Sequence, residues 1–220
     1  MADETEPLVL YECRDRVATI TFNRPSRLNA FNDDMTREAL AAMHRFDLDP
    51  EADVAVLTGA GRAFSSGADV QQRQLRPREE MEKHGGPQAR DANSENLLTD
   101  CVNWKPVICA AHGYVLGLAL GIALESDLIV AEEALRVNII DQVAPKGEYL
   151  AAAQELARTI AKNPPLGVRH TVQLRRWELK KVQQEAVRTV RAAKLNLSED
   201  FLESARAFVE KRPAGPFKGR

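Results

Sequence analysis

The sequence predicts an α/β fold with a layered core, followed by a helical C-terminal region. Three observations lead to this prediction. Short apolar strands alternate with helix-forming segments, the pattern after residue 147 is helical, and 220 residues suit one substantial core with a helical extension. We therefore place the sheet-bearing core in residues 1–147 and the helical region in residues 148–220.

The first expected elements are a strand, a turn and a helix. Residues 17–22 are rich in β-formers and end at the turn signal Asn23-Arg-Pro25. Asn32 is a suitable N-cap, and Asp33 and Asp34 would follow in the first helical turn. Apolar residues recur behind this cap at helical spacing, namely Met35, Ala39, Leu40, Met43 and Phe46. The sequence therefore predicts a helix that starts after Asn32.

Three more strands complete the expected core. They lie at residues 53–58, 107–111 and 128–131, and a glycine-spaced helix separates the last two. The polar residues 71–96 are expected to form either a mobile loop or a surface helix.

Helices are expected throughout the C-terminal region. We predict them at residues 166–195 and 199–211, after a break at Asn163-Pro-Pro165. Residues 151–220 carry 15 Lys and Arg against 7 Asp and Glu. This excess of positive charge is typical of a solvated helix face. The alternatives are that it binds a phosphorylated ligand or a nucleic acid.

Composition indicates a soluble cytoplasmic protein without a membrane span. Hydrophobic residues make up 44% and charged residues 28% of the chain, and the longest apolar run, residues 107–123, is short and cut by glycines. The acidic start lacks the layout of a signal peptide. The three cysteines have no metal-type spacing and leave an odd thiol, which suits a reducing compartment.

Two segments are candidates for holding a carbonyl oxygen. Residues 59–69 and 110–121 each run from an apolar strand through a glycine-containing turn into an expected helix start, with Asp69 in the first turn of the earlier helix. Such a start leaves backbone N–H groups unpaired at a positive dipole end, and the Ala68 and Leu118 N–H groups are the natural donors. Ordinary strand-to-helix turns and close packing at the glycines are the alternative explanations.

Motifs along nearly the whole chain resemble the enoyl-CoA hydratase/isomerase (crotonase) superfamily. The matching segments, in chain order, are Val17-Ala-Thr-Ile-Thr-Phe-Asn-Arg-Pro25 with Asn29-Ala30, Val56-Leu-Thr-Gly59, Gly61-Arg-Ala-Phe-Ser-Ser-Gly-Ala-Asp69, Lys105-Pro-Val107, His112-Gly-Tyr114, Gly117, Ser126-Asp127-Leu128, Glu199-Asp200, Ala207-Phe-Val-Glu-Lys-Arg212 and Phe217-Lys-Gly219. Their common order makes the resemblance more specific than any single motif.

The resemblance implies a crotonase-like spiral of ββα units that binds acyl-CoA, usually as a trimer or a dimer of trimers. It implies an oxyanion hole formed by the backbone N–H groups of Ala68 and Leu118. The CoA ester would lie along a group of residues comprising Ser66, Gly67, Asp69 and Gly117, and the phosphates would meet Lys211 and Arg212. No cofactor beyond the CoA thioester is expected.

The acid groups depart from the family pattern. Hydratases of the family carry a glutamate at the position of Gly121, and the second acid, in a Pro-Glu segment, is absent. Glu125, one helical turn after Gly121, is a candidate for proton transfer or a structural partner of an arginine. His112 is a candidate ligand contact or a hydrogen-bonded structural residue, and Asp127 is expected to be structural. No catalytic triad or metal-ligand cluster is legible.

The chain is also shorter than the family pattern by roughly 50 to 60 residues near residues 131–138, a figure that the resemblance implies. A real deletion, a misassembled gene and a missing segment are three open explanations.

Three functional hypotheses follow. The first is a crotonase-type hydratase or isomerase, and the second is an acyl-CoA-binding or scaffold protein that lacks the acid/base glutamates. The third and weakest is nucleic-acid binding through the basic residues 169–194, which have little aromatic interleaving.

Overall fold

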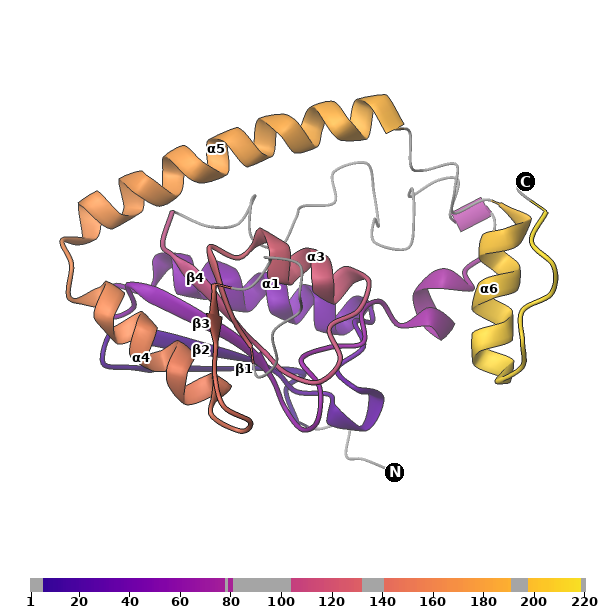
Figure 1. The fold of residues 1–220 in the computed structure, drawn as a ribbon, viewed down its shortest axis with the longest axis horizontal. Helices are drawn as coiled ribbons and strands as arrows, with labels where there is room; N and C mark the ends of the chain where they lie inside the picture. Colours follow the sequence, from indigo (N-terminus) through magenta and orange to yellow (C-terminus); the bar gives the residue numbers. More distant parts are fainter. Residues whose placement is uncertain (1–5, 78, 81–103, 132–140, 191–197, 219–220) are drawn as a thin grey trace. The chain divides into compact units, whose positions relative to one another are not determined.

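A six-stranded mixed sheet organises the computed structural model, which describes residues 6–77, 79–80, 104–131, 141–190 and 198–218. The strands are β1 (Val9–Arg14), β2 (Val17–Phe22), β3 (Val54–Gly59), β4 (Val107–Ala111), β5 (Leu128–Ala131) and β6 (Gln142–Val143) (Figure 1). They lie in chain order, with β1 and β2 antiparallel and every later pair parallel. One row of paired residues crosses five strands: Tyr11, Ile20, Leu57, Cys109 and Ile129.

Helices cover both faces of this sheet. Helices α1 (Asp33–Leu48) and α3 (Leu118–Glu125) share one buried cluster with alternate strand residues, whereas α4 (Tyr149–Ala161) packs on the opposite face. In β3, for example, Ala55 and Leu57 face α1 and α3, and Val54 and Val56 face α4. A strand buried on both faces needs apolar residues at every position, which explains the continuous apolar runs in the sequence.

Helix α1 begins as the sequence predicts. The Asn32 side chain accepts a hydrogen bond of 2.8 Å from the Met35 N–H, and Asp33 and Asp34 occupy the first turn. At the other end the buried Lys105 ammonium donates to the carbonyl oxygens of Phe46 at 2.9 Å and Asp49 at 2.7 Å. Burial lowers the pKa of Lys105. These contacts satisfy carbonyl groups that the helix end leaves open.

The predicted elements recur with small shifts. Strands β2, β4 and β5 have the predicted bounds, and β3 begins and ends one residue later than predicted. The sequence analysis missed β1, an edge strand with alternating burial, and the two-residue strand β6 at the other edge. Helix α5 (Pro165–Val190) begins one residue before the predicted position 166, and residues 191–195 of that prediction lie outside the described residues. Helix α6 (Glu199–Glu210) ends one residue before the predicted 211. Within 71–96, the described residues include the π-helix η2 (Val70–Gln74), and residues 78 and 81–96 lie outside the described residues.

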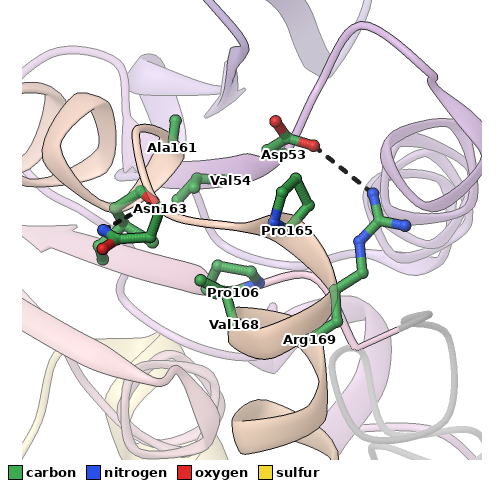
Figure 2. Close-up of a pocket in the computed structure, with 9 residues that line it drawn as sticks. Asp53, Val54, Pro106, Ala161, Asn163, Pro165, Val168 and Arg169 are labelled. Carbon is green, nitrogen blue, oxygen red and sulfur yellow. Dashed lines mark hydrogen bonds and ion pairs between the residues drawn. The ribbon is translucent and has the colours of Figure 1, made fainter.

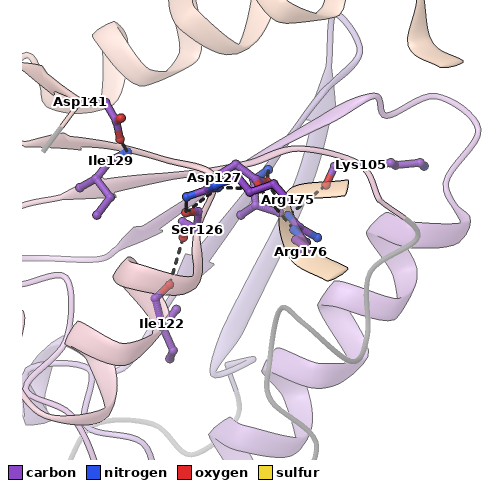
Figure 3. Close-up of polar contacts among 9 residues, drawn as sticks. Lys105, Ile122, Ser126, Asp127, Ile129, Asp141, Arg175 and Arg176 are labelled. Atoms are coloured by element: carbon purple, nitrogen blue, oxygen red, sulfur yellow. Dashed lines mark hydrogen bonds and ion pairs between the residues drawn. The ribbon is translucent and has the colours of Figure 1, made fainter. Parts of the chain in front are cut away.

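Helix α5 is tied to the amino ends of β4 and β5 through a buried ion pair (Figure 3). The Arg176 guanidinium pairs with Asp127 and donates to the Lys105 carbonyl at 3.3 Å. The Asp127 carboxylate also accepts from the Val107 N–H at 2.8 Å and from Arg175 at 2.9 Å. Asp127 therefore has the structural role that the sequence analysis expected, and one carboxylate connects a strand, a loop and a helix.

The chain divides into two compact units. The first comprises residues 1–67 and 96–178, and the second comprises residues 68–95 and 179–220. In the second unit, α6 contacts η2. The boundary that we predict between residues 147 and 148 stays a prediction.

Candidate functional site

Two loops that leave the carboxyl ends of β3 and β4 are hydrogen-bonded to each other. The Phe64 N–H donates to the His112 carbonyl at 2.8 Å, and the Ser65 N–H donates to the Tyr114 carbonyl at 3.0 Å. The Leu116 N–H returns a bond of 3.2 Å to the Ser65 carbonyl. The parts of the two predicted segments that belong to the first unit therefore lie side by side, at the end of parallel strands where ligands commonly bind.

A buried asparagine holds the first loop in place. Asn29 has a φ of 53° and is fully buried, and its side-chain amide donates to the carbonyls of Ala60 at 2.9 Å and Ala63 at 2.7 Å. The Ser65 hydroxyl donates to the Asn29 carbonyl at 2.7 Å and accepts from the Gly67 N–H at 3.0 Å. The sequence analysis missed both roles. At position 29 the sequence signal was that asparagine tolerates a positive φ. At position 65 the sequence contains no signal for the role of the serine.

Gly67 packs directly against the start of α3. Its φ is 92°, and its carbonyl accepts from the Phe31 N–H at 2.8 Å. A Cβ built on Gly67 would overlap the Leu116 carbonyl oxygen and lie 3.3 Å from the Leu118 nitrogen. Only glycine therefore fits here, for both conformational and steric reasons.

The Leu118 N–H is available at the first turn of α3. Gly117 precedes it as N-cap with a φ of 52° and provides no side-chain cap. Ala119 donates to Leu116 at 3.0 Å and Gly121 donates to Gly117 at 3.1 Å, whereas the Leu118 N–H has no hydrogen-bond acceptor among the described residues. An unpaired N–H at a helix start favours an oxygen with partial negative charge.

The partner donor, Ala68, begins the second unit. The preceding N–H groups are occupied, since Ser66 donates to Leu28 at 2.9 Å and Gly67 donates to Ser65, but no acceptor for Ala68 occurs in the described ranges. Asp69 is the N-cap of η2 and accepts from Gln72 at 3.2 Å, so our placement of Asp69 inside a helical turn was wrong by one position. The pairing of Ala68 with Leu118 stays a prediction.

The candidate proton-transfer residues lie farther along α3. Gly121 is exposed, and a Cβ built there would meet nothing within 4 Å. Glu125 ends the helix and is partly buried.

His112 lies before α3, in the loop that follows β4. It contacts the Gly61 carbonyl through Nε2 at 3.0 Å and stacks on Tyr149 with ring centroids 4.4 Å apart. These contacts suit the structural role for His112, and catalysis by Glu125 stays a prediction.

The predicted phosphate partners follow α6 in the second unit. Lys211 is the C-cap of α6, and Arg212 donates to Glu203 at 2.6 and 3.1 Å and to Glu210 at 2.6 Å. A CoA phosphate at Arg212 would therefore compete with two carboxylates. Binding by Lys211 and Arg212 stays a prediction.

The same contacts give Glu203 an unusual acidity. Hydrogen bonds from Arg212 and from the Gly215 N–H lower the pKa of Glu203 to about 2. A lowered pKa stabilises the folded unit above the ordinary pKa of 4.5, and this contribution is lost as the pH falls toward 2. We expect Glu203 to remain ionised at pH 3.5 in a carboxyl-carbon NMR titration.

The variant Arg212→Ala should move this titration up toward the ordinary range. Arg158→Ala, which removes another arginine that pairs with a helix glutamate, should leave it in place. A Glu203 that titrates near 4.5 in the unmodified protein would contradict the role of Arg212.

A small pocket lies away from these loops. Its lining includes Asp53, Pro106, Asn163 and Arg169, from the starts of β3 and β4 and the junction of α4 and α5 (Figure 2). It is therefore at the amino ends of the parallel strands, whereas the glycine loops follow the carboxyl ends. Within the described residues no cluster of metal-ligating side chains occurs, and no helix is long and apolar enough to cross a membrane.

Comparison with known proteins identifies relatives along nearly the whole chain. A sequence model of the family described as "Enoyl-CoA hydratase/isomerase" matches residues 12–132 and 118–220. Enoyl-CoA hydratase EchA19 of Mycobacterium tuberculosis is 30% identical, over 95% of this chain and 96% of the relative. Short-chain-enoyl-CoA hydratase of Clostridium acetobutylicum is 26% identical, over 96% of this chain and 98% of the relative. The crystal structure of carnitinyl-CoA hydratase from Mycobacterium avium superposes with a TM-score of 0.77 at 26% identity, over 98% and 100% of the two chains.

These alignments also reveal residues that the chain lacks. The alignment with EchA19 is 259 residues long, whereas the aligned 95% of 220 residues is about 209, so about 50 positions have no counterpart. Residues 118–132 belong to both family matches, so the missing positions fall within or next to this stretch. This agrees with the predicted shortfall, although most of the predicted location, residues 132–138, lies outside the described residues.

Proposed function

Since the chain belongs to the enoyl-CoA hydratase/isomerase (crotonase) family, we propose that it is an enzyme that processes acyl-CoA thioesters. The observation that carries this proposal is the unpaired Leu118 N–H at the start of α3, packed against Gly67. The thioester oxygen would accept hydrogen bonds from the Leu118 and Ala68 N–H groups. Backbone donors of this kind interact more strongly with the oxygen as negative charge develops on it, so they would stabilise an enolate.

The proton-transfer step favours isomerisation over ordinary hydration. Moving a double bond takes a proton from one carbon and returns it to another, which a single carboxylate can do. Hydration adds water and in this family generally uses two acids. Glu125 is the carboxylate that we propose for proton transfer, because it lies on α3 and Gly121 has no side chain. The proposed reaction uses no cofactor beyond the CoA thioester itself.

A second function is favoured by the same position. The resemblance implies that Gly121 stands at the family's acid position, and about 50 positions of the alignment with EchA19 have no counterpart in this chain. A protein that kept the thioester site and lost the acids would bind acyl-CoA without transforming it.

Calorimetry and turnover of a short enoyl-CoA separate the two functions. Binding with a shifted double bond or added water, followed by absorbance and mass spectrometry, supports the enzyme. Binding without any product supports the acyl-CoA-binding protein. Failure of every CoA ester to bind would contradict both.

Adding a carboxylate at position 121 is expected to raise hydration. A Cβ at Gly121 meets nothing within 4 Å, so Gly121→Glu should fold normally. A positioned acid or base contributes typically 10²- to 10⁴-fold, and we expect a gain of about 100-fold in 2-butenoyl-CoA hydration. Gly121→Gln has the same shape without the charge and should give no gain. Equal rates for the two variants would contradict a proton-transfer role for position 121.

We also propose that the protein forms a homo-oligomer, as a trimer or a dimer of trimers, which light scattering would measure. Nucleic-acid binding has less support, because Arg175 and Arg176 in the basic region both pair with Asp127.

A further inference from the structure

The His112 side chain connects the two loops of the candidate site beyond the reach of their backbone bonds. The first loop comprises residues 60–67 and the second comprises residues 112–117. Backbone hydrogen bonds between them begin at Phe64, whereas the imidazole reaches further back toward β3 and contacts the Gly61 carbonyl at 3.0 Å. His112 is 7% exposed, and a hydrogen bond shielded from water is stronger than one at the surface.

The direction of this bond follows from its acceptor. A carbonyl oxygen can only accept, so Nε2 carries the proton and donates it to Gly61. The other ring nitrogen, Nδ1, is buried and has no hydrogen-bond partner among the residues that the structure describes. Within those residues, any polar role of the imidazole therefore acts through the bond to Gly61.

The bond to Gly61 complements the contacts of Asn29. The Asn29 amide donates to the Ala60 carbonyl at 2.9 Å and to the Ala63 carbonyl at 2.7 Å, on either side of Gly61. Asn29 belongs to the segment between β2 and α1, whereas His112 belongs to the loop that leads into α3. Without the imidazole, the first loop would keep its attachment to Asn29 and lose its side-chain attachment to the second loop.

The two loops are already in backbone contact beside this bond. Gly113 follows His112 with a φ of 55°, and a Cβ built there would lie 2.1 Å from the Arg62 carbonyl oxygen. Because the backbones touch, the loops cannot move closer together here and can only move apart. Steric contact thus sets the smallest separation of the loops, and the imidazole bond opposes any larger one.

We infer that His112 is a positioning residue of the proposed thioester site, which holds the two loops together through its bond to Gly61 and thereby places the Leu118 N–H against the thioester oxygen. The inference rests on the proposed function and adds the side chain that keeps this donor in position. The contribution of such a donor depends on where it points, since hydrogen bonds weaken steeply as they lengthen or bend.

The stack on Tyr149 is the competing explanation for a ring at position 112. The two rings lie 4.4 Å apart with an angle of 17° between their planes, and Tyr149 is the first residue of α4. A ring needed only for this packing could be replaced by another ring, and its effect would disappear when Tyr149 is changed. A ring that acts through Gly61 must instead provide a donor.

Infrared difference spectroscopy of a bound thioester tests the inference on the complete chain and does not require turnover. Butanoyl-CoA, labelled with ¹³C at the thioester carbonyl, is bound to the unmodified protein and to each variant after circular dichroism has shown that the variant folds. Hydrogen bonds to the carbonyl oxygen lower its stretching frequency, so the shift on binding reports the donors. Affinity is measured by calorimetry.

The matched variants at position 112 are His112→Gln and His112→Met. Both side chains are unbranched and similar in length, but only glutamine carries an amide donor near the place of Nε2. We expect His112→Gln to keep the shift and His112→Met to lose most of it. His112→Phe keeps a ring without a donor and should also lose the shift, whereas Tyr149→Leu removes the stack and should keep it.

Turnover of a short enoyl-CoA should follow the infrared shift. A misplacement of about 1 Å can cost about 100-fold in rate, so we expect kcat to fall about 10- to 100-fold in His112→Met and much less in His112→Gln. The affinity for butanoyl-CoA should change less than kcat, because the bond to Gly61 does not touch the ester.

The other outcomes contradict specific statements. Equal shifts in His112→Gln and His112→Met, or a loss of the shift in Tyr149→Leu as large as in His112→Met, would overturn the inference and leave the proposed function standing. If the two ringless variants do not fold, His112→Phe decides in the same way. Failure of all three to fold would show that His112 holds the fold rather than the site. An unmodified protein that binds no ester, or binds it without a shift, would overturn the proposed thioester site as well.

Discussion

Replacing Gly67 with alanine is expected to reduce the affinity and turnover of CoA esters by about 100-fold or more. The added Cβ would overlap the Leu116 carbonyl oxygen and crowd the Leu118 nitrogen at 3.3 Å. The φ of 92° is also strained for any residue with a side chain, at about 1–3 kcal/mol. The loop must move to relieve both, and it carries the donor at Ala68. Loss of one oxyanion donor costs about 10²- to 10³-fold.

Gly167→Ala is the matched control for this change. Gly167 lies in the first turn of α5, and a Cβ built there would meet nothing within 4 Å. Alanine is the better helix former, so stability should stay equal or rise. Calorimetric binding and turnover are compared after circular dichroism has shown that both variants fold. Wild-type affinity in folded Gly67→Ala would contradict the proposed place of the thioester.

Replacing Asp127 with alanine is expected to destabilise the first unit by about 3–5 kcal/mol, the typical cost of breaking a buried ion pair. Arg176 is 1% exposed and would keep its charge without a carboxylate partner. The Val107 N–H, bonded to Asp127 at 2.8 Å, would also lose its acceptor. Because both losses are buried, water cannot replace the missing oxygen atoms.

Urea unfolding followed by circular dichroism measures this loss as a lower midpoint. Arg37→Ala removes an exposed ion pair with Asp34 and should leave the midpoint nearly unchanged. A double variant, Asp127→Asn with Arg176→Met, removes the charge as well as its partner and should recover part of the stability. A midpoint for Asp127→Ala equal to that of Arg37→Ala would show that the pair contributes little.

The sequence predicted the sheet and most helices because their signals are local. Strands β2, β4 and β5 are buried on one or both faces, so their apolar runs stand out from the polar segments around them. Strand β1 escaped prediction because it lies at the edge of the sheet and alternates Leu10, Glu12 and Arg14 with less exposed residues. Its place depends on pairing with β2.

In the candidate site, too, some residues were recognised from the sequence and others were not. The glycines at 67 and 117 were recognised because glycine has few other reasons to recur at strand-to-helix turns. The residues that hold these turns were not recognised, since Asn29 reaches carbonyls more than 30 residues away. Asparagine and serine occur in many loops, and only contact with Ala60, Ala63 and Gly67 distinguishes these two.

Periodicity and capping residues were thus enough to identify strands β2 to β5 and the start of α1, and the order of the motifs along the chain was enough to identify the family. The tertiary structure decided which donors are occupied, that Arg176 and Asp127 form the buried pair, and that the Leu120 and Leu124 side chains on α3 remain exposed. The physical reason is that these features depend on contacts between residues distant in the chain. A local pattern encodes which face of an element is apolar, but not which segment will cover it.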